Sequence, residues 1–285
     1  MRVCREYQFA KIQGFELGWS PVGQPMMTTH CYTLGDLMVD TGQAHMQKEV
    51  IQIAQNAGVR QVVLTHHHED HSGNAAMIKN QLGACVFGNA LTARKMATRF
   101  NIFPYQKYVW GKSSPLQIDP FPEEIKTCFG PLIPVHAPGH SKDHMVYYLK
   151  DEGILFSGDL YLADHIKFFR ADEDMGSQIA SLKKILALDF DMILCGHFPK
   201  QNNGKRHIQN KLMFLEDLYG SIIQLREQGL EAKQIFKTLN LKEARFVKYF
   251  CFGNVSMMNG VRSAIRHYEK QESDREQGRG PAPLF

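Results

Sequence analysis

The sequence has few of the features that would place a protein in a membrane, outside the cell or on nucleic acid. No continuous apolar run is long enough to span a bilayer, and Met1–Glu6 contains no apolar signal-peptide core. The six cysteines are scattered without paired spacing, which favours a reducing compartment over a disulfide framework. A formal net charge of +4 is small for 285 residues and does not indicate a nucleic-acid partner. We therefore expect a cytoplasmic globular protein without membrane association.

Short apolar runs alternate with helical patterns through roughly the first 200 residues. Predicted strands cover Met27–Thr33, Leu37–Val39, Val62–Leu64, Cys85–Phe87, Leu132–Val135, Met145–Leu149, Ile154–Phe156 and Met192–Leu194. Predicted helices cover Met46–Ala57, Ala75–Leu82, Leu91–Thr98 and Ile179–Leu188. Because β-α-β alternation is mixed with antiparallel-looking strands, the pattern predicts two packed sheets with helices outside.

The pattern becomes helical after Asn203-Gly204. Apolar residues at three- and four-residue steps predict helices over His207–Gln228, Leu230–Leu239 and Val255–Lys270. We expect a two-sheet domain over residues 1–204, a helical C-terminal domain over 205–271 and a disordered tail over 272–285. The apolar stripe of the helices has to be buried, either on the chain's own core or against a second copy in a homodimer.

One run of ten residues, from Thr65 to Asn74, contains four histidines and two carboxylates and follows a strand-like apolar stretch. The run has the form H-x-H-x-D-H, in which His67 and Glu69 are the spacers. Buried polar groups are costly unless something pairs them, so packing alone does not explain such a cluster. The run therefore predicts a metal site.

Other predicted strands also end in an acid or a histidine, usually beside a glycine. These residues are Asp40, His140, Asp159 and His197. Strand ends at one sheet edge can converge, and functional sites are commonly built on the loops held there. We expect these side chains to join the histidine run at one site.

These motifs occur in the order that is typical of the metallo-β-lactamase-fold hydrolase superfamily, and the chain resembles that superfamily. The matching residues are Asp40, His66, His68, Asp70, His71, His140 in Pro138-Gly139-His140-Ser141, Asp159 in Ser157-Gly158-Asp159, and His197 in Cys195-Gly196-His197. The helical C-terminal segment makes it similar to glyoxalase II-like and lactamase-B2-like members. The resemblance implies an α+β fold, namely a four-layer αββα sandwich with an all-helical C-terminal appendage.

The resemblance implies two metal sites. His66, His68 and His140 would hold one metal, and Asp70, His71 and His197 would hold the other, with Asp159 bridging both. The spacing agrees, because alternate residues of an extended segment point the same way, and His66 and His68 can then share a metal.

Two metals about 3.5–4 Å apart would activate a bridging water. Asp70 is then the expected catalytic residue, placed to orient that water and receive its proton. Asp40 resembles the family's aspartate that hydrogen-bonds a ligand histidine. His144 lies close to a ligand, and a purely structural role is as plausible for it as a supporting role at the site. Cys195 is expected to be buried packing.

Two zinc ions are the expected cofactors, although iron or manganese accepts the same donors. His68 stands where the iron-dependent flavoprotein members carry a glutamate, which favours zinc. No set of lysines and arginines matches a glutathione site.

The expected function is metal-dependent hydrolysis of an ester, thioester or related acyl bond in a small-molecule substrate. The alternatives are a phosphodiesterase or ribonuclease, an iron-dependent persulfide dioxygenase, and a low-turnover regulatory member of the fold. The small net charge argues against nucleic acid. Substrate contacts are expected from Tyr105–Trp110, from the loop after Asp159 and from the C-terminal helices.

Overall fold

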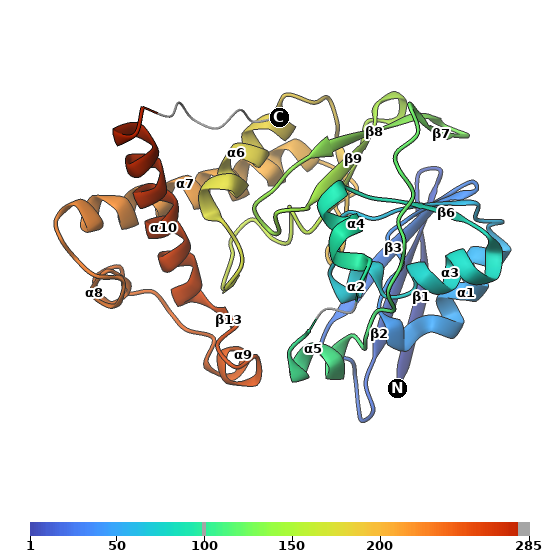
Figure 1. Ribbon diagram of the computed structural model, residues 1–285, viewed down its shortest axis with the longest axis horizontal. Helices are drawn as coiled ribbons and strands as arrows, with labels where there is room; N and C mark the ends of the chain where they lie inside the picture. The colour runs from blue at the N-terminus through green and yellow to red at the C-terminus, as the bar shows by residue number, and fades with distance from the viewer. Residues whose placement is uncertain (99–100, 279–285) are drawn as a thin grey trace. The chain divides into compact units, whose positions relative to one another are not determined.

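The computed structural model describes residues 1–98 and 101–278, which form two compact units (Figure 1). The first unit comprises Met1–Val135, Asp143–Leu162 and Asp189–Gly204. The second comprises His136–Lys142, Ala163–Leu188 and the chain from Lys205 onward. The boundary predicted after residue 204 is one limit between the units, but two earlier segments also group with the C-terminal helices. The division into a two-sheet and a helical domain stays a prediction.

The first unit contains a six-stranded and a five-stranded sheet. The six strands, in sheet order, are β1 (Arg2–Phe9), β2 (Ile12–Trp19), β3 (Thr28–Leu34), β4 (Leu37–Val39), β5 (Gln61–Val63) and β6 (Cys85–Phe87). The five strands, in sheet order, are β12 (Met192–Cys195), β10 (Ile154–Gly158), β9 (Met145–Leu149), β8 (Gly130–His136) and β7 (Ile125–Thr127). The helices of this unit are η1 (Ala44–Met46), α1 (Gln47–Asn56), α2 (Glu69–Ser72), α3 (Ala75–Leu82), α4 (Ala90–Met96), α5 (Pro104–Val109) and η2 (Lys150–Glu152).

Alternating side chains of the central strands enter two different cores. In β5, Val63 joins a cluster with residues of the five-stranded sheet, such as Tyr147 and Phe156. Its neighbour Val62 joins a second cluster with α1 and α3. Successive strand residues face opposite sides, so a strand covered on both faces must be apolar throughout. The first unit therefore stacks helices, one sheet and the other sheet in layers.

Each sheet contains a pair of parallel strands, and the loops that carry the predicted site residues follow the carboxyl ends of these four strands. β4 pairs parallel with β5 in the larger sheet, and β10 pairs parallel with β12 in the smaller sheet. Parallel neighbours end at the same edge, so the loops that follow them lie side by side. These loops carry Asp40, the run from Thr65 to Asn74, Asp159 and His197.

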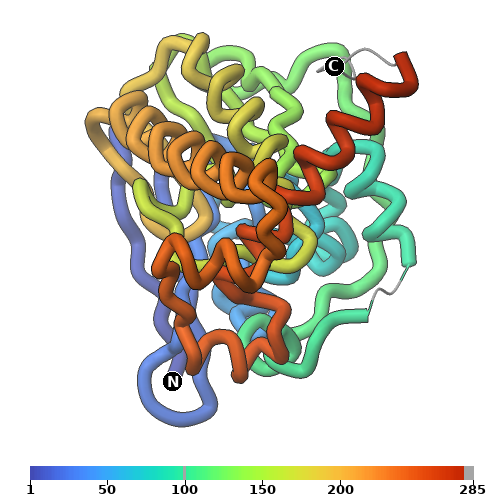
Figure 2. The backbone as a smooth tube through the Cα atoms, turned by 90° about the vertical axis from the view of Figure 1, so that its left-hand side faces the viewer, coloured from blue at the N-terminus to red at the C-terminus, as the bar shows by residue number. Residues whose placement is uncertain are grey.

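The second unit is mainly helical (Figure 2). Its elements are β11 (Phe169–Arg170), α6 (Met175–Leu186), α7 (Gly204–Glu227, within the unit from Lys205), α8 (Ala232–Thr238), α9 (Arg245–Phe250), β13 (Val255–Ser256) and α10 (Met257–Glu276). Helix α10 packs on α6 and α8, and the Ser256 side chain accepts a hydrogen bond from Met258 N at its start. Ser256 is thus the N-cap of α10. Among the described residues, no helix is both long and apolar enough to cross a bilayer.

The prediction that the tail becomes disordered at residue 272 is wrong for its first five residues. Helix α10 continues through Glu276, and Arg275 forms an ion pair with Glu272 one turn earlier, at 2.7 Å. Charged residues at three-residue spacing support a helix even where no apolar face is buried. Residues 279–285 of the predicted tail lie outside the described part of the chain.

The cluster between the larger sheet and helices α1 and α3 yields a stability prediction. Val86 in β6 is fully buried there, whereas Val22 is 84% exposed. Val86→Ala should lower the free energy of unfolding by about 2 kcal/mol, because it removes two buried methyl equivalents. The matched change Val22→Ala should cost less than about 0.5 kcal/mol. Urea denaturation of both variants checks this, and equal losses would contradict the assigned core.

Candidate metal centre

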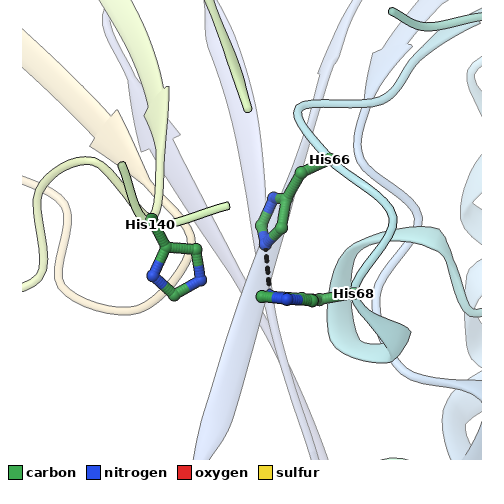
Figure 3. Close-up of side chains that lie close together, drawn as sticks. All are labelled: His66, His68 and His140. Atoms are coloured by element: carbon green, nitrogen blue, oxygen red, sulfur yellow. Dashed lines mark hydrogen bonds between the residues drawn. The ribbon is translucent and has the colours of Figure 1, made fainter. Parts of the chain in front are cut away.

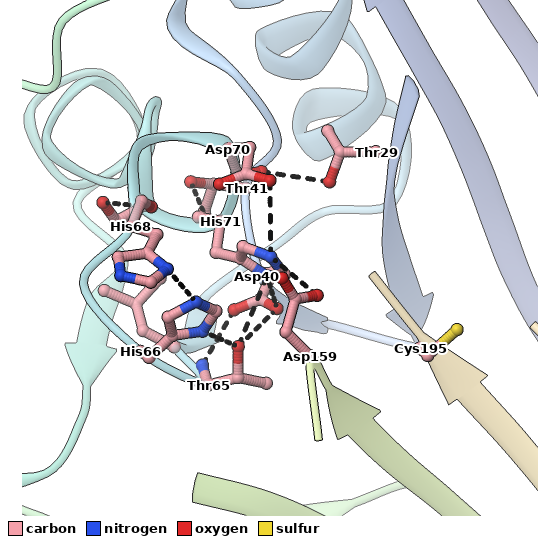
Figure 4. Close-up of polar contacts among 12 residues, drawn as sticks. Thr29, Asp40, Thr41, Thr65, His66, His68, Asp70, His71, Asp159 and Cys195 are labelled. Carbon is pink, nitrogen blue, oxygen red and sulfur yellow. Dashed lines mark hydrogen bonds and ion pairs between the residues drawn. The ribbon is translucent and has the colours of Figure 1, made fainter. Parts of the chain in front are cut away.

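Hydrogen bonds from two threonine side chains to backbone carbonyls hold the histidine run after the carboxyl end of β5. Helix α2 begins at Glu69, so Asp70 and His71 lie on its first turn. Thr29 Oγ1 donates to the carbonyl of Asp70 at 3.2 Å, and Thr41 Oγ1 donates to that of His71 at 2.9 Å (Figure 4). These bonds set where α2 directs its side chains.

Four predicted ligands come together inside the first unit: Asp70, His71, Asp159 and His197. All four are buried, and their ligand atoms lie within 4.8 Å of one another. His71 Nε2 is 3.2 Å from Asp159 Oδ1 and 3.6 Å from Asp70 Oδ2. His197 Nε2 is 3.3 Å from Asp70 Oδ2 and 3.5 Å from Asp159 Oδ2.

These separations fit the donor set of a tetrahedral metal ion. Ligands held at about 2.0–2.1 Å from zinc at tetrahedral angles are separated from one another by about 3.3 Å. His71 Nε2 is also a buried atom that makes no hydrogen bond to any atom of residues 1–98 or 101–278. A buried nitrogen without a hydrogen bond, among carboxylates at this spacing, is what a metal ligand requires. The residues therefore fit a divalent metal.

Oxygen acceptors orient the two histidine rings of this group. His71 Nδ1 donates to Asp40 Oδ2 at 2.7 Å, and His197 Nδ1 donates to the carbonyl of Thr28, also at 2.7 Å. Carboxylate and carbonyl oxygens only accept, so each ring carries a proton on Nδ1 and directs Nε2 at the carboxylates.

His66 and His68 form a neighbouring pair. His66 Nε2 lies 2.8 Å from His68 Nδ1 (Figure 3). Thr65 Oγ1 donates to Asp40 Oδ2 at 2.8 Å and lies 3.0 Å from His66 Nδ1, so it accepts the proton of that nitrogen. The lone pair of His66 Nε2 then faces His68, whose Nδ1 donates to it.

Asp40 connects the two groups of histidines. Its carboxylate accepts hydrogen bonds from Thr65 N, Thr65 Oγ1 and His71 Nδ1. Its backbone has φ +56°, a left-handed conformation that non-glycine residues adopt at an energetic cost. The three hydrogen bonds offset that cost. Asp40 thus fixes the ring of His71, one of the residues that could hold a metal.

Gly196 provides the space for this arrangement. A Cβ atom at this position would lie 2.5 Å from His71 Cε1 and 2.6 Å from Asp159 Oδ1. Neither contact is tolerable, so only glycine allows the chain entering His197 to pass beneath the other ligands.

The charges of the group are strongly coupled in the metal-free protein. Burial alone would lower the pKa of His197, but Asp159 and Asp70 outweigh it and raise that pKa to about 10. The same carboxylates, with Asp40, hold the pKa of His71 well above its usual range against burial. Against burial, His71 and His197 lower the pKa of Asp70 to about 2. The carboxylates therefore favour the protonated form of both imidazole rings at neutral pH.

His140 belongs to the second unit. The ring is buried, and Nδ1 lies 3.1 Å from Glu173 Oε1, to which it donates. Its ring therefore follows the same pattern as His71, with Nδ1 on an oxygen acceptor and Nε2 as the nitrogen that could bind a metal. Glu173 was not among the sequence candidates, because it lies 33 residues from His140 in a loop without a motif.

The two spacers of the run have partners away from the four-residue group. His67 Nδ1 lies 3.0 Å from Asp143 Oδ1, and Glu69 accepts from Gln106 Nε2 at 3.0 Å. His144 contacts the group itself, because its Nε2 accepts from the backbone N of Asp159 at 3.0 Å. Its adjacency to the Gly139-His140 motif was the only sequence signal for this contact.

Cys195 is part of the buried core. Its thiol is fully buried, and burial raises its pKa to about 12. Figure 4 shows its sulfur away from the cluster. Within the aromatic segment predicted to contact substrate, Trp110 does lie beside the site, with its ring 6.1 Å from that of His197.

The balanced charges predict how metal binding depends on pH. A metal needs neutral His71 and His197, and both are protonated in the metal-free chain at neutral pH, so binding should release two protons. Metal affinity should therefore fall by up to about 100-fold for each unit that the pH is lowered below neutrality. Calorimetric titration in buffers of different ionisation enthalpy measures the release. Binding without proton release would contradict the assignment.

The family model of the Metallo-beta-lactamase superfamily matches residues 31–197. A Beta-lactamase-like protein 2 homolog of Drosophila melanogaster is 28% identical over 78% of both chains. A hydroxyacylglutathione hydrolase of Methylobacillus flagellatus is 29% identical over 59% of both chains. An atrochrysone carboxyl ACP thioesterase of Aspergillus fumigatus is 26% identical over 69% of this chain and 59% of its own. The chain thus spans less than two thirds of the last two relatives.

Solved structures share the fold. A metallo-beta-lactamase family protein of Thermus thermophilus has a TM-score of 0.62 at 20% identity, covering 90% of this chain and 94% of its own. The metallo-beta-lactamase FIM-1 of Pseudomonas aeruginosa, in a mono-zinc form, has a TM-score of 0.56 at 20% identity over 75% of this chain and 95% of its own. The predicted α+β sandwich with a C-terminal helical segment is confirmed. The chain belongs to the metallo-beta-lactamase superfamily and is a hydrolase of that superfamily.

Proposed function

We propose that this hydrolase uses two metal ions to cleave an ester, thioester or related acyl bond of a small molecule. The observation that carries the proposal is the spacing of 3.2–3.6 Å between the two Nε2 atoms and the carboxylates of Asp70 and Asp159. The names of the hydroxyacylglutathione hydrolase and the ACP thioesterase among its relatives favour an acyl bond over other substrates.

In this proposal the ligands divide into two sets. Asp70, His71 and His197 hold one metal, His66, His68 and His140 hold the other, and Asp159 bridges them. Zinc is the proposed metal, since imidazole and carboxylate donors at tetrahedral spacing suit it, and iron or manganese is the alternative. Such ions lower the pKa of water and stabilise the charge that develops on a carbonyl oxygen.

The residues of the chain then have separate tasks. Asp70 is ionised at neutral pH and provides the carboxylate that orients water and takes its proton. Asp40 holds His71 through Nδ1 and, through Thr65, also holds His66. His144 fixes the backbone of Asp159. Trp110 provides an apolar wall beside His197, suited to the non-reacting part of a substrate.

Replacing Asp70 tests this assignment directly. Asp70→Ala should lower kcat/KM for a model thioester by at least about 10²–10⁴-fold, the range supplied by a positioned acid–base group. The matched control is Asp151→Ala, which removes an exposed carboxylate of the same unit and should leave kcat/KM unchanged. A wild-type kcat/KM in Asp70→Ala would contradict the proposed role of this carboxylate in hydrolysis.

Metal content and a substrate panel separate the acyl hydrolase from its alternatives. We expect about two zinc ions per chain by mass spectrometry and turnover of thioesters or esters. Preferential cleavage of bis-(p-nitrophenyl) phosphate or single-stranded RNA would favour a phosphodiesterase. One iron per chain, with oxygen uptake on a persulfide, would favour a dioxygenase. Metal binding without turnover of any substrate would favour a regulatory member.

A further inference from the structure

The loop that carries His140 is built into the helical unit. Asp174 N donates to the carbonyl of Gly139 at 2.8 Å, and Ser181 Oγ donates to that of Pro138 at 2.7 Å. Lys184 Nζ donates to the carbonyl of His136 at 3.1 Å. All three donors lie on α6 or just before it, so this helix fixes the path of the loop.

Gly139 allows the loop to lie close to Gln178 of α6. Its φ is +137°, and a Cβ atom there would lie 2.4 Å from Gln178 N. Any other residue would push the loop away from α6. The residue directly before the ligand histidine therefore has its position determined by the helical unit.

The ring of His140 is oriented by a buried carboxylate. Glu173 Oε1 accepts from His140 Nδ1 at 3.1 Å, and Glu173 Oε2 accepts from Gln178 Nε2 at 2.8 Å. His140, Glu173 and Gln178 are 4%, 7% and 2% exposed, so water does not compete for these bonds. A carboxylate on Nδ1 fixes both the tautomer and the direction of Nε2.

Helix α10 holds Glu173 in turn. Ser263 lies on α10, is 1% exposed and donates through Oγ to the carbonyl of Glu173 at 2.7 Å. The same Oγ accepts from Met175 N at 2.9 Å, at the start of α6. One hydroxyl of α10 thus joins both sides of the turn that presents the Glu173 carboxylate to His140.

We propose that Glu173 and Ser263 are positioning residues through which α10 sets the occupancy of one metal site. The inference rests on the proposed ligand set, in which His140 completes a site with His66 and His68. The other four-residue set lies wholly in the first unit, as do the Asp40 and Thr28 oxygens that orient its histidines. Loss of the Glu173 carboxylate should therefore lower the metal affinity of one site and leave that of the other unchanged.

Metal stoichiometry in the full chain tests the proposal. Zinc titration of the metal-free protein should show two sites in the wild type, and Glu173→Gln should weaken one of them by about 10–100-fold. Ser263→Ala should weaken the same site, by a smaller factor, because it acts through Glu173. The matched control is Ser273→Ala, an exposed serine on the same helix, which should bind both metals as the wild type does.

A second readout does not depend on metal. Nitrogen-15 NMR of the metal-free protein should show His140 protonated on Nδ1 in the wild type, and a mixture of tautomers in Glu173→Gln. Circular dichroism confirms that each variant is folded. Two wild-type affinities in Glu173→Gln, or equal weakening of both sites, would overturn the proposal.

Fewer than two metals in the wild type would instead refute the proposed ligand set. The His140 tautomer then still decides whether Glu173 positions the ring. An unchanged tautomer in Glu173→Gln would overturn the positioning role.

Discussion

Asp40 accepts three hydrogen bonds at the carboxyl end of β4, and the arrangement of the first unit's ligands depends on them. Its carboxylate orients His71 directly and His66 through the hydroxyl of Thr65. Its left-handed backbone conformation has an energetic cost, which these three hydrogen bonds offset. Removal of this one charge would leave buried donors on Thr65 and His71 without an acceptor, which costs more than any single surface interaction.

Much of the first unit could be predicted because its strands are buried on both faces. Cys85–Phe87 and Met145–Leu149 were predicted to the residue, since apolar runs bounded by turns mark such strands. Strand β1 was missed because only its residues Val3 and Phe9 are buried, so its many exposed residues hide the strand pattern. Helices α5 and α9 were missed because both are short. Helix α9 has six residues and none of them is buried, and α5 also has six residues, of which Tyr105, Gln106 and Val109 are buried.

The candidate site divides in the same way between local and distant information. His66, His68, Asp70 and His71 fall in one run, and their spacing alone indicates a metal. Glu173 could not be found from sequence, because a loop glutamate has no pattern that links it to a histidine 33 residues earlier. Asp143 could not be identified from the sequence either, although its buried carboxylate accepts hydrogen bonds from His67, Thr92 and Lys95. The roles of such supporting residues depend on tertiary contacts, which the periodicity of the sequence does not reveal.

The buried side chains of Asp70, His71, Asp159 and His197 carry charges of opposite sign. Burial disfavours each charge, and the opposite charges beside it restore it, which is why the pKa values of the two histidines are raised and that of Asp70 is lowered. Replacing one of these residues with an apolar one would therefore leave another buried charge without its partner.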